Sequence, residues 1–539
     1  MDNYKPFNEI ELGFSDAENY LNDHKEMFKT IFINRELNSL MKRSITYLIG
    51  EKGTGKTAYA VYFENNDYKN TKSERINMDN IISHSFISST EKNFNFKNCK
   101  EDWTVLLLLK MAKSITPEDL ENTDSNNNQH FLNLREKIKD IDLSSIYNNI
   151  EITIKTTDSN NIALGGKIDT HIIKVSGEAN SQVLKSVEID QLFITNIVSL
   201  HNLKNDFIDA FKKIRLKRNR FIFIDKVDDF KKDIAFSNFL LLIKGLGEAA
   251  HDLNTEVFGK IKGNYYTKFI LLLRPEIFGK LDMYNQGSKA TNNSVILDWL
   301  TSYNDYRNSD LFELADNILR YANKELDDEN KKEKGFYWDL YFKWDAPSTN
   351  PVTRERDDAF ISFLRSSLCR PRDIVNFLLS IQKQAIHVKS KQIDTTFECF
   401  NSFHCQKDIS DYFLAEAKDW CRYKYPETTF ETIKKFFSFI NTGKAIDYNT
   451  YCKCFENFKM SCEINGDKIF EEMQNPQKFL QLLYDLNMIC YIQSDHMGGT
   501  FQTYCYRLRS LTELSPVIPI NKEYRIHRAL LKSLNIEER

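Results

Sequence analysis

The hydrophobic pattern of the chain is dominated by three short runs, at residues 45–49, 221–224 and 269–273, in which almost every position is apolar. Alternating positions would indicate strands with one wet face, whereas short continuous runs are typical of strands buried on both faces of a parallel sheet. Polar or glycine-rich segments follow each run. The pattern therefore predicts an α/β core whose strands end at one ligand-accessible edge.

Helical spacing dominates elsewhere. Residues 105–109 predict a buried helix, while Leu311, Leu314 and Ile318 fall on one face of another. A further helix is expected to begin near Pro371, because the fixed φ of proline suits a first helical turn. We therefore predict four parts, namely an N-terminal lead-in at 1–46, the strand-containing core at 47–295, a helical lid-like domain at 296–405 and a C-terminal domain at 406–539.

Two segments of the chain have the alternating pattern of strands instead of helical spacing. Residues 151–189 alternate around Gly165-Gly166, which predicts a hairpin or small sheet inserted into the core at about 115–200. Near the C-terminus, a predicted helix at 479–489 is followed by predicted strands at 490–493 and 503–508, joined through Gly498-Gly499. Helices followed by such a hairpin predict a winged-helix-like domain, a shape that binds DNA or proteins with similar ease.

Composition and charge limit the class of protein to which the chain can belong. A chain of 539 residues is long enough for about three domains, and 41% hydrophobic with 28% charged residues is typical of a soluble globular protein. The net charge of −3 argues against a globally basic nucleic-acid binder. No apolar run is long enough for a membrane span, and the N-terminus lacks a signal-peptide pattern. We expect a cytoplasmic protein that does not associate with membranes.

The ten cysteines all lie from Cys369 onward, except Cys99. Cys452 and Cys454 with Cys462, or His404 with Cys405, are metal-site candidates. No C-x-x-C pair is present, and most of the cysteines sit among aromatic and aliphatic residues. Reduced, buried thiols are therefore the favoured interpretation.

The clearest chemical motif is the segment 50–57, Gly-Glu-Lys-Gly-Thr-Gly-Lys-Thr, which follows the first apolar run and precedes a helix-forming stretch. It is a complete P-loop in its strand–loop–helix setting. Its glycines let successive N–H groups point at phosphate oxygens, and the helix start adds its positive end. We expect an ATP site formed by Gly50, Glu51, Lys52, Gly53, Thr54, Gly55, Lys56, Thr57 and Ala58.

The second motif is the acidic end of the run at 221–224. Lys56 is expected to reach the β- and γ-phosphates, and Thr57 to ligate Mg²⁺ together with Asp225. Asp228 and Asp229 are candidates for the general base that polarises the attacking water; capping of the next helix is the alternative role for either. Thr57 and Asp225 lie much further apart than the roughly 30 residues of one βαβ unit, which supports a large insertion between them.

Three arginines are candidates for sensing the nucleotide. Arg274 follows the run at 269–273, where a side chain would lie near the γ-phosphate; an ion pair with Glu276 is the structural alternative. Arg370 and Arg372 flank Pro371 at a predicted helix start, where they would contact phosphates or form local ion pairs.

A basic segment at 212–220 precedes the second apolar run. It is a candidate for contact with a nucleic-acid backbone, but a solvated charge run leading into a strand is the commoner explanation.

Several segments occur in a familiar order: 13–18, the P-loop, 273–278, 297–299, 370–373 and 524–527. With these segments the chain resembles, over nearly its full length, a family of bacterial P-loop ATPases of AAA+/STAND type. Its members are mostly uncharacterised and often look like components of defence against phage, in which the ATPase acts with a partner or effector. The acidic ending at 225–229 is closer to the STAND pattern than to the Asp-Glu pair of typical AAA+ members, which favours a slow switch over a processive motor.

The resemblance implies nucleotide binding by the P-loop, magnesium handling by Asp225 and a winged-helix-like region that ends in the His527 segment. We therefore predict an ATP- and Mg²⁺-dependent switch that forms a homo-oligomer and regulates a separately encoded effector. A DNA-engaging ATPase, with DNA bound by the C-terminal domain, and a scaffold that holds nucleotide without hydrolysis are the alternatives. A GTPase is less well supported, because no Asn-Lys-x-Asp segment follows a strand.

Overall fold

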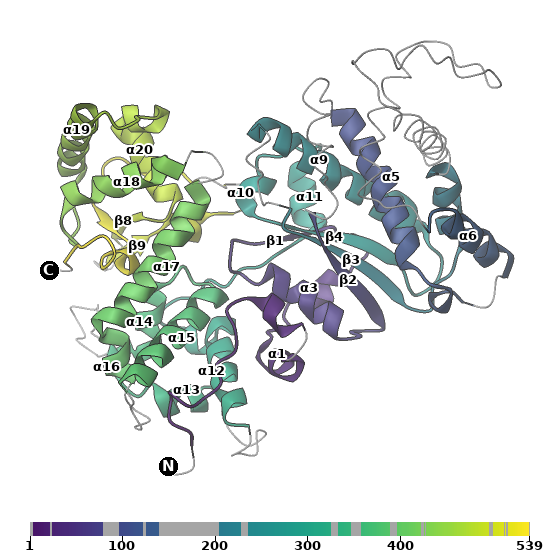
Figure 1. Ribbon diagram of the computed structural model, residues 1–539, viewed down its shortest axis with the longest axis horizontal. Coiled ribbons are helices and arrows are strands. Elements are labelled where there is room, and N and C mark those ends of the chain that lie inside the picture. Colours follow the sequence, from purple (N-terminus) through teal and green to yellow (C-terminus); the bar gives the residue numbers. More distant parts are fainter. Residues whose placement is uncertain are drawn as a thin grey trace, which may run out of the picture.

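A computed structural model shows how these segments are arranged (Figure 1). It describes residues 4–21, 24–78, 96–121, 125–139, 204–227, 235–324, 333–346, 357–388, 396–421, 425, 427–494, 500–510, 513 and 516–537. The β-rich insertion predicted at 151–189 lies outside the described residues, as do Asp228 and Asp229.

The centre of the molecule is a five-stranded sheet in the order β2-β3-β4-β1-β5. Every neighbouring pair in it is parallel. The strands are β1 (Tyr47–Ile49), β2 (Thr71–Asn77), β3 (Asn219–Asp225), β4 (Thr267–Leu273) and β5 (Ser294–Ile296). The predicted α/β core with a parallel sheet is confirmed. Because the strands are parallel, the residues that follow β1, β3 and β4 lie close together at the carboxyl-terminal end of the sheet.

Strand β2 was not predicted from the sequence pattern. Its residues, Thr-Lys-Ser-Glu-Arg-Ile-Asn, are mostly polar, and only Thr71 is fully buried. The strand lies at the edge of the sheet, where one side meets solvent and charged side chains are common. The strand-like run at 81–87 lies outside the described residues.

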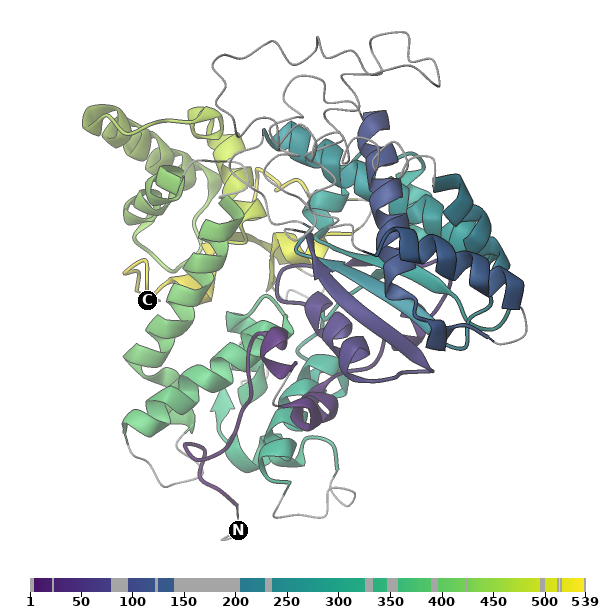
Figure 2. The ribbon, with the colours of Figure 1, turned by 45° about the vertical axis from the view of Figure 1, so that its right-hand side comes forward.

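Helices cover both faces of the sheet, as Figures 1 and 2 show. Alternate residues of β3 point to opposite faces: Phe221 and Phe223 pack in one cluster, Ile222 and Ile224 in another. The first cluster includes α2 (Leu37–Leu40) and α3 (Lys56–Asn65). The second includes α5 (Phe96–Ser114), which contains the predicted helix at 105–109, together with α6 (Ser125–Lys137), helical residues 204–213 and α9 (Phe236–Asp252).

The part after β5 is helical, as predicted. Its elements are α12 (Asp310–Ala322), α13 (Phe336–Tyr341), α14 (Ala359–Ser366), α15 (Pro371–His387), α16 (Thr396–Asn401) and α17 (Phe403–Cys421), with a two-stranded ladder of β6 (Asp345–Ala346) and β7 (Asp357–Asp358). Pro371 is the first residue of α15, as its position in the sequence indicated.

The N-terminal segment crosses this helical part before it reaches the sheet (Figure 2). The ring of Phe7 packs edge-on against Tyr341 and Phe342, with centroids 5.6 Å away in both cases. The segment then forms η1 (Ala17–Tyr20) and α1 (Lys25–Ile31) beside α3. The lead-in therefore bridges the two parts of the molecule.

The C-terminal part contains α18 (Glu427–Ile440), α19 (Tyr448–Asn465) and α20 (Pro476–Asp485), followed by an antiparallel sheet in the order β10-β8-β9. Its strands are β8 (Ile489–Ser494), β9 (Thr500–Thr503) and β10 (Tyr524–Ile526). One prediction is wrong, because residues 505–508 form the short helix α21 (Cys505–Leu508) instead of continuing β9. The winged-helix interpretation stays a prediction.

A single hydrophobic cluster joins the lead-in, the helical part and the C-terminal part. The predicted domain boundaries stay a prediction. None of the described helices combines the length and the apolar character needed to cross a lipid bilayer.

Candidate nucleotide site

The P-loop connects β1 to α3 at the carboxyl-terminal ends of the parallel strands. The N–H of Gly50 donates to the carbonyl of Leu273 at 3.1 Å, which anchors the loop start to β4. Gly53 and Gly55 have φ values of 86° and 92°. Such left-handed conformations favour glycine, and they turn the loop back toward the start of α3. The geometry agrees with the phosphate-cradling loop that the spacing predicts.

Lys56 begins α3, and its ammonium group reaches back across the loop. Its Nζ donates to the carbonyl of Gly50 at 2.7 Å and to that of Glu51 at 3.2 Å. The lysine therefore holds the loop closed on its own backbone in this structure. A bound phosphate would offer the ammonium group a charged acceptor instead of two neutral ones.

Thr57 and Asp225 come together although they are far apart in sequence. The Thr57 hydroxyl donates to Asp225 Oδ2 at 2.9 Å, and Asp225 is only 5% exposed. A hydroxyl and one carboxylate suit Mg²⁺, which usually takes one or two protein carboxylates and completes its shell with phosphate and water. Among the described residues no group of three or more histidine, cysteine or acidic side chains is placed to hold a metal ion.

Arg75, Glu18 and Lys226 form an ion-pair network beside Asp225 that the sequence analysis did not identify as functional. Arg75, near the end of β2, lies 3.2 Å from Asp225 Oδ2 and 2.6 Å from Glu18 Oε1 through its Nη1. Lys226 Nζ lies 3.2 Å from the same Glu18 oxygen. Burial raises the pKa of Glu18, but the bonds and charges of Arg75 and Lys226 outweigh it and leave the pKa below its ordinary value. An arginine is thus poised next to the carboxylate expected to hold Mg²⁺.

A hollow of about 240 Å³, the P-loop pocket, lies in front of the loop. Lys56, Thr57 and Asp225 line it, and so do Arg274 and Arg372. The lead-in contributes another wall, formed by Phe14, Ser15, Asp16, Ala17 and Tyr20. The N-terminal segment therefore completes a site that the P-loop motif alone does not define.

The other sensor candidates have the following positions. Arg274 precedes α10 (Pro275–Phe278) and is 8% exposed. The backbone N–H of Arg372 donates to the Gly53 carbonyl at 3.3 Å. A Cβ on Gly53 would come within 3.1 Å of the Cβ of Arg372, which is a tight contact, and the positive φ of Gly53 also favours glycine. Their roles toward a nucleotide stay predictions.

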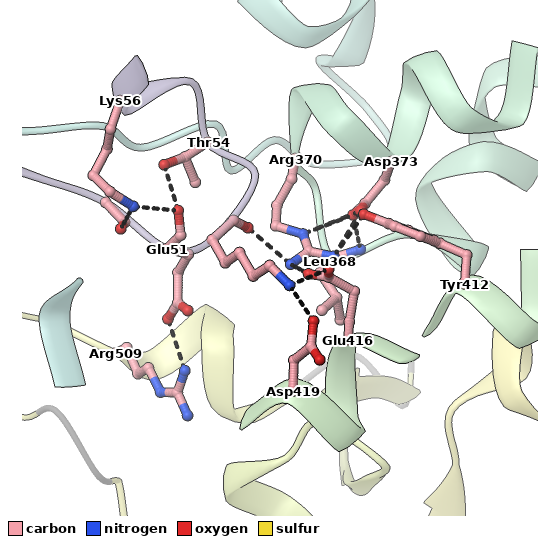
Figure 3. Close-up of polar contacts among 12 residues, drawn as sticks. Glu51, Thr54, Lys56, Leu368, Arg370, Asp373, Tyr412, Glu416, Asp419 and Arg509 are labelled. Atoms are coloured by element: carbon pink, nitrogen blue, oxygen red, sulfur yellow. Dashed lines mark hydrogen bonds and ion pairs between the residues drawn. The ribbon is translucent and has the colours of Figure 1, made fainter. Parts of the chain in front are cut away.

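Arg370 contacts the back of the loop, as Figure 3 shows. Its Nη1 donates to the carbonyl of Lys52 at 2.8 Å and to Glu416 at 3.1 Å. Its Nη2 lies 2.7 Å from Asp373, which is completely buried. Burial lowers the pKa of this arginine, yet the charges of Asp373 and Glu416 keep it well above its ordinary value. Arg370 is held as a fixed cation that links the loop to α15 and α17.

Three further ion pairs hold the back of the loop (Figure 3). Glu51 Oε1 lies 2.7 Å from Nη1 of Arg509, which follows α21. Burial raises the pKa of Glu51, but Arg509 foremost holds it below its ordinary value. Lys52 Nζ lies 2.8 Å from Glu416 and 2.8 Å from Asp419, both on α17. The loop is therefore fastened to the helical and the C-terminal parts.

The basic segment leads into the amino-terminal end of β3, whereas the P-loop lies at the carboxyl-terminal ends of the strands. Arg218 and Arg220 place their Nε atoms 3.2 and 3.1 Å from the buried carboxylate of Asp119, and Arg220 also donates to the Ser114 carbonyl. These two arginines stabilise the start of β3. Their pairing favours the structural interpretation of the segment over a nucleic-acid contact.

Comparisons with known proteins do not assign this chain to a family. No protein-family model matches the chain, and no curated protein matches it. Among solved structures, the chain is similar to the ORC1 protein of Aeropyrum pernix in complex with DNA, at 10% sequence identity and a TM-score of 0.33 over 96% of this chain and 94% of that one. A likeness this loose carries no argument about what this chain does. The functional interpretation therefore rests on the site.

Proposed function

We propose that this protein is a Mg²⁺-dependent ATPase that acts as a nucleotide-dependent switch. One observation carries the proposal, namely that four consecutive P-loop residues are each contacted from a different later part of the chain. Arg509 pairs with Glu51, and α17 pairs with Lys52. The N–H of Arg372 bonds Gly53, and the indole of Trp299 donates to the Thr54 carbonyl at 2.9 Å. Any movement of the loop must change these contacts.

The proposed switch begins at Lys56. A triphosphate in the P-loop pocket draws its ammonium group away from the carbonyls of Gly50 and Glu51. Those carbonyls lie just before Lys52 in the chain. Their release therefore moves the loop backbone and changes its contacts with α15, α17 and Arg509. A ligand moves such an equilibrium only through contacts that differ between the two states, and the Lys56 contacts differ in this way.

Hydrolysis resets the switch in this proposal. Thr57 and Asp225 hold Mg²⁺, which when bound neutralises phosphate charge. Arg274 is proposed to stabilise charge on the γ-phosphate, since it lines the P-loop pocket at the end of β4. Asp228 or Asp229 is proposed to polarise the attacking water, because both closely follow Asp225 in the sequence.

The output of the switch is proposed to be a protein. The resemblance to defence-associated ATPases suggests a homo-oligomer that regulates a separate effector, and the helical and C-terminal parts are the surfaces that the loop contacts would move. DNA is a second possible occupant of the C-terminal part.

The proposal is tested by ATP turnover of the purified chain with and without duplex DNA, together with its mass in each nucleotide state. Lys56→Ala should abolish nucleotide binding, Asp225→Ala should abolish turnover, and the surface control Lys383→Ala should change neither. Turnover that is indifferent to DNA, with a mass that depends on nucleotide, supports the switch. Turnover stimulated by DNA would support a DNA-engaging ATPase instead. Bound ATP that is never hydrolysed would leave a structural scaffold.

A further inference from the structure

A second hollow, the rear cavity, lies behind the P-loop. Its volume is about 510 Å³, roughly twice that of the P-loop pocket, and it is enclosed by the sheet core, α17 and the C-terminal part. The two hollows share Lys52, Arg274 and Trp299 as wall residues. The loop therefore separates two spaces, of which the nucleotide motif explains only one.

The wall of the rear cavity is largely apolar. Leu297, Phe413, Ala417 and Met488 line it, and each of them is otherwise buried. Ile296 and Leu300 also line it, but 43% and 42% of their surface remains exposed, which indicates a way in from solvent. Small-molecule sites are usually concave, of about 300 to 1,000 Å³, and mostly apolar with a few fixed polar groups. The cavity fits this description in size and in lining.

Four wall residues carry buried polar atoms that lack a hydrogen-bond partner within the part of the chain that the structure describes. They are the indole Nε1 of Trp420, the Nε of Arg509, the Oε2 of Glu276 and the Nε2 of His527. Buried polar atoms in proteins nearly always have a partner, and each exception needs an explanation. The atoms of Trp420 and Arg509 are donors. Glu276 is buried next to the negative Glu51, and both effects raise its pKa against the opposing charges of Arg274 and Arg509.

Five of the charged residues around the cavity are already paired with one another. Arg509 is paired with Glu51, while Lys52 and Arg370 share Glu416. A charged occupant would have to displace one of these buried pairs, at the cost of leaving its partner uncompensated. A neutral occupant with one hydrogen-bonding edge would keep the pairs intact and supply the missing partners.

We propose that the rear cavity binds a neutral, aromatic small molecule with an amide-like edge, whose carbonyl accepts from Trp420 and Arg509 and whose N–H donates to Glu276. The site lies on the other side of the loop from the P-loop pocket, and the two share Lys52, Arg274 and Trp299 as wall residues. Because Glu51 and Lys52 form part of its wall, an occupant also shifts the balance between loop states; this coupling, unlike the binding, rests on the proposed function.

The test uses 2-naphthamide as the probe, titrated into the full chain without nucleotide and followed by calorimetry and saturation-transfer NMR. We expect saturable binding of one equivalent. Ala417→Phe fills the cavity from α17 and should weaken binding by about tenfold or more, because overpacking excludes the probe. Ala415→Phe is the matched control, since Ala415 lies on the same helix but is exposed, and it should leave binding within about twofold of the wild type.

Two further variants keep the proposal falsifiable if Ala417→Phe fails to fold, which thermal melting will show. Trp420→Phe keeps an aromatic ring, although a smaller one, but removes the donor, and should weaken binding about fivefold, as expected for one hydrogen bond. The exposed Lys383→Ala should bind the probe like the wild type. Because the titration contains no nucleotide, its result does not depend on the nucleotide assignment. No saturable binding, or binding unchanged in Trp420→Phe, would overturn the proposal.

Discussion

At the scale of single residues, Asp225 is contacted from two sides with opposite consequences. Thr57 donates to the same Oδ2 that Arg75 approaches to 3.2 Å. The hydroxyl is a ligand that Mg²⁺ accepts, whereas the guanidinium is a cation that competes with Mg²⁺ for the carboxylate. Glu18 lies 2.6 Å from Arg75 and can retain the arginine when a metal ion arrives.

Removing Arg75 should therefore tighten magnesium binding. We expect Arg75→Ala to lower the Mg²⁺ concentration for half-maximal ATP turnover by about threefold to tenfold, as expected for the loss of one nearby positive charge. The measurement is turnover across a magnesium series at saturating ATP. Arg218→Ala is the control, because Arg218 pairs with Asp119 at the other end of the same sheet. An unchanged or higher magnesium requirement would show that Arg75 does not compete for Asp225.

His527 is a buried group whose charge state matters for stability. It is 1% exposed, stacks on Phe413 with ring centroids 5.5 Å apart, and accepts from the N–H of Ala529 at 3.2 Å. Burial foremost, together with the positive charges of Arg370 and Arg507, lowers its pKa to about 4. The histidine is therefore neutral in the folded protein at neutral pH.

This pKa predicts a loss of stability in mild acid. In the unfolded chain the histidine has a pKa of about 6.5 and takes up a proton below it, while the folded chain resists until about pH 4. Stability thus falls as pH drops through this window, by about 2 kcal/mol at pH 5 for this residue. Urea unfolding at pH 7 and pH 5 should show this difference shrinking in His527→Gln. The exposed His130→Gln should behave like the wild type; equal pH dependence in all three proteins would refute the assignment.

At the scale of elements, the sequence predicts best where burial is uniform. Strands β3 and β4 are buried at every position, so their continuous apolar runs are unmistakable. Strand β2 escapes prediction because an edge strand tolerates the charges of Lys72, Glu74 and Arg75. Residues 503–508 mislead for another reason, since Tyr504, Cys505 and Tyr506 are all buried and the pattern alone does not distinguish a short helix from a strand.

The candidate site likewise has residues that the sequence predicts and residues that it does not. The P-loop is local, so its spacing predicts the loop, Lys56 and Thr57, and the acidic end of an apolar run predicts Asp225. The contacts of Arg75 with Glu18 and of Arg509 with Glu51 join residues that are distant in sequence. Such pairs follow from tertiary packing, and nothing in their local sequence signals them. The same holds for the two hollows on either side of the loop.

The start of α15 shows how strongly a buried ion pair should matter. Arg370 and Asp373 are 7% and 0% exposed, and removing one charge leaves the other buried without compensation. We expect Arg370→Met to destabilise the protein by about 3 to 5 kcal/mol. Adding Asp373→Asn should recover part of the loss, because it neutralises the stranded carboxylate. Urea unfolding measures both effects.

A control lies on the same helix. Lys383 pairs with Asp408, but the two side chains are 74% and 38% exposed. Lys383→Ala should therefore cost under about 0.5 kcal/mol. If Arg370→Met were as mild as this control, Arg370 would not hold the loop against α15.

At the scale of the whole molecule, the P-loop lies where all the parts meet. The lead-in lines the pocket in front of it, and Glu51 and Lys52 join it to the C-terminal part and to α17 behind. The hydrophobic cluster that unites the lead-in, the helical part and the C-terminal part is separate from the two clusters on the sheet. Packed units that have separate cores can shift relative to one another, which a switch requires.

Arg509 should therefore transmit the nucleotide state without binding the nucleotide. Its guanidinium is 6% exposed, pairs with Glu51 at 2.7 Å and donates to the carbonyl of Asp485 at 2.7 Å. We expect Arg509→Met to keep nucleotide affinity within about threefold of the wild type, because no contact to phosphate is removed. The nucleotide-dependent change in shape or mass should disappear, as measured by small-angle scattering with ADP and with a non-hydrolysable ATP analogue. Arg525→Met, which removes a C-terminal arginine bonded to the Gly443 carbonyl, should keep the change. A full response in Arg509→Met would mean that the loop signals through α15 and α17 alone.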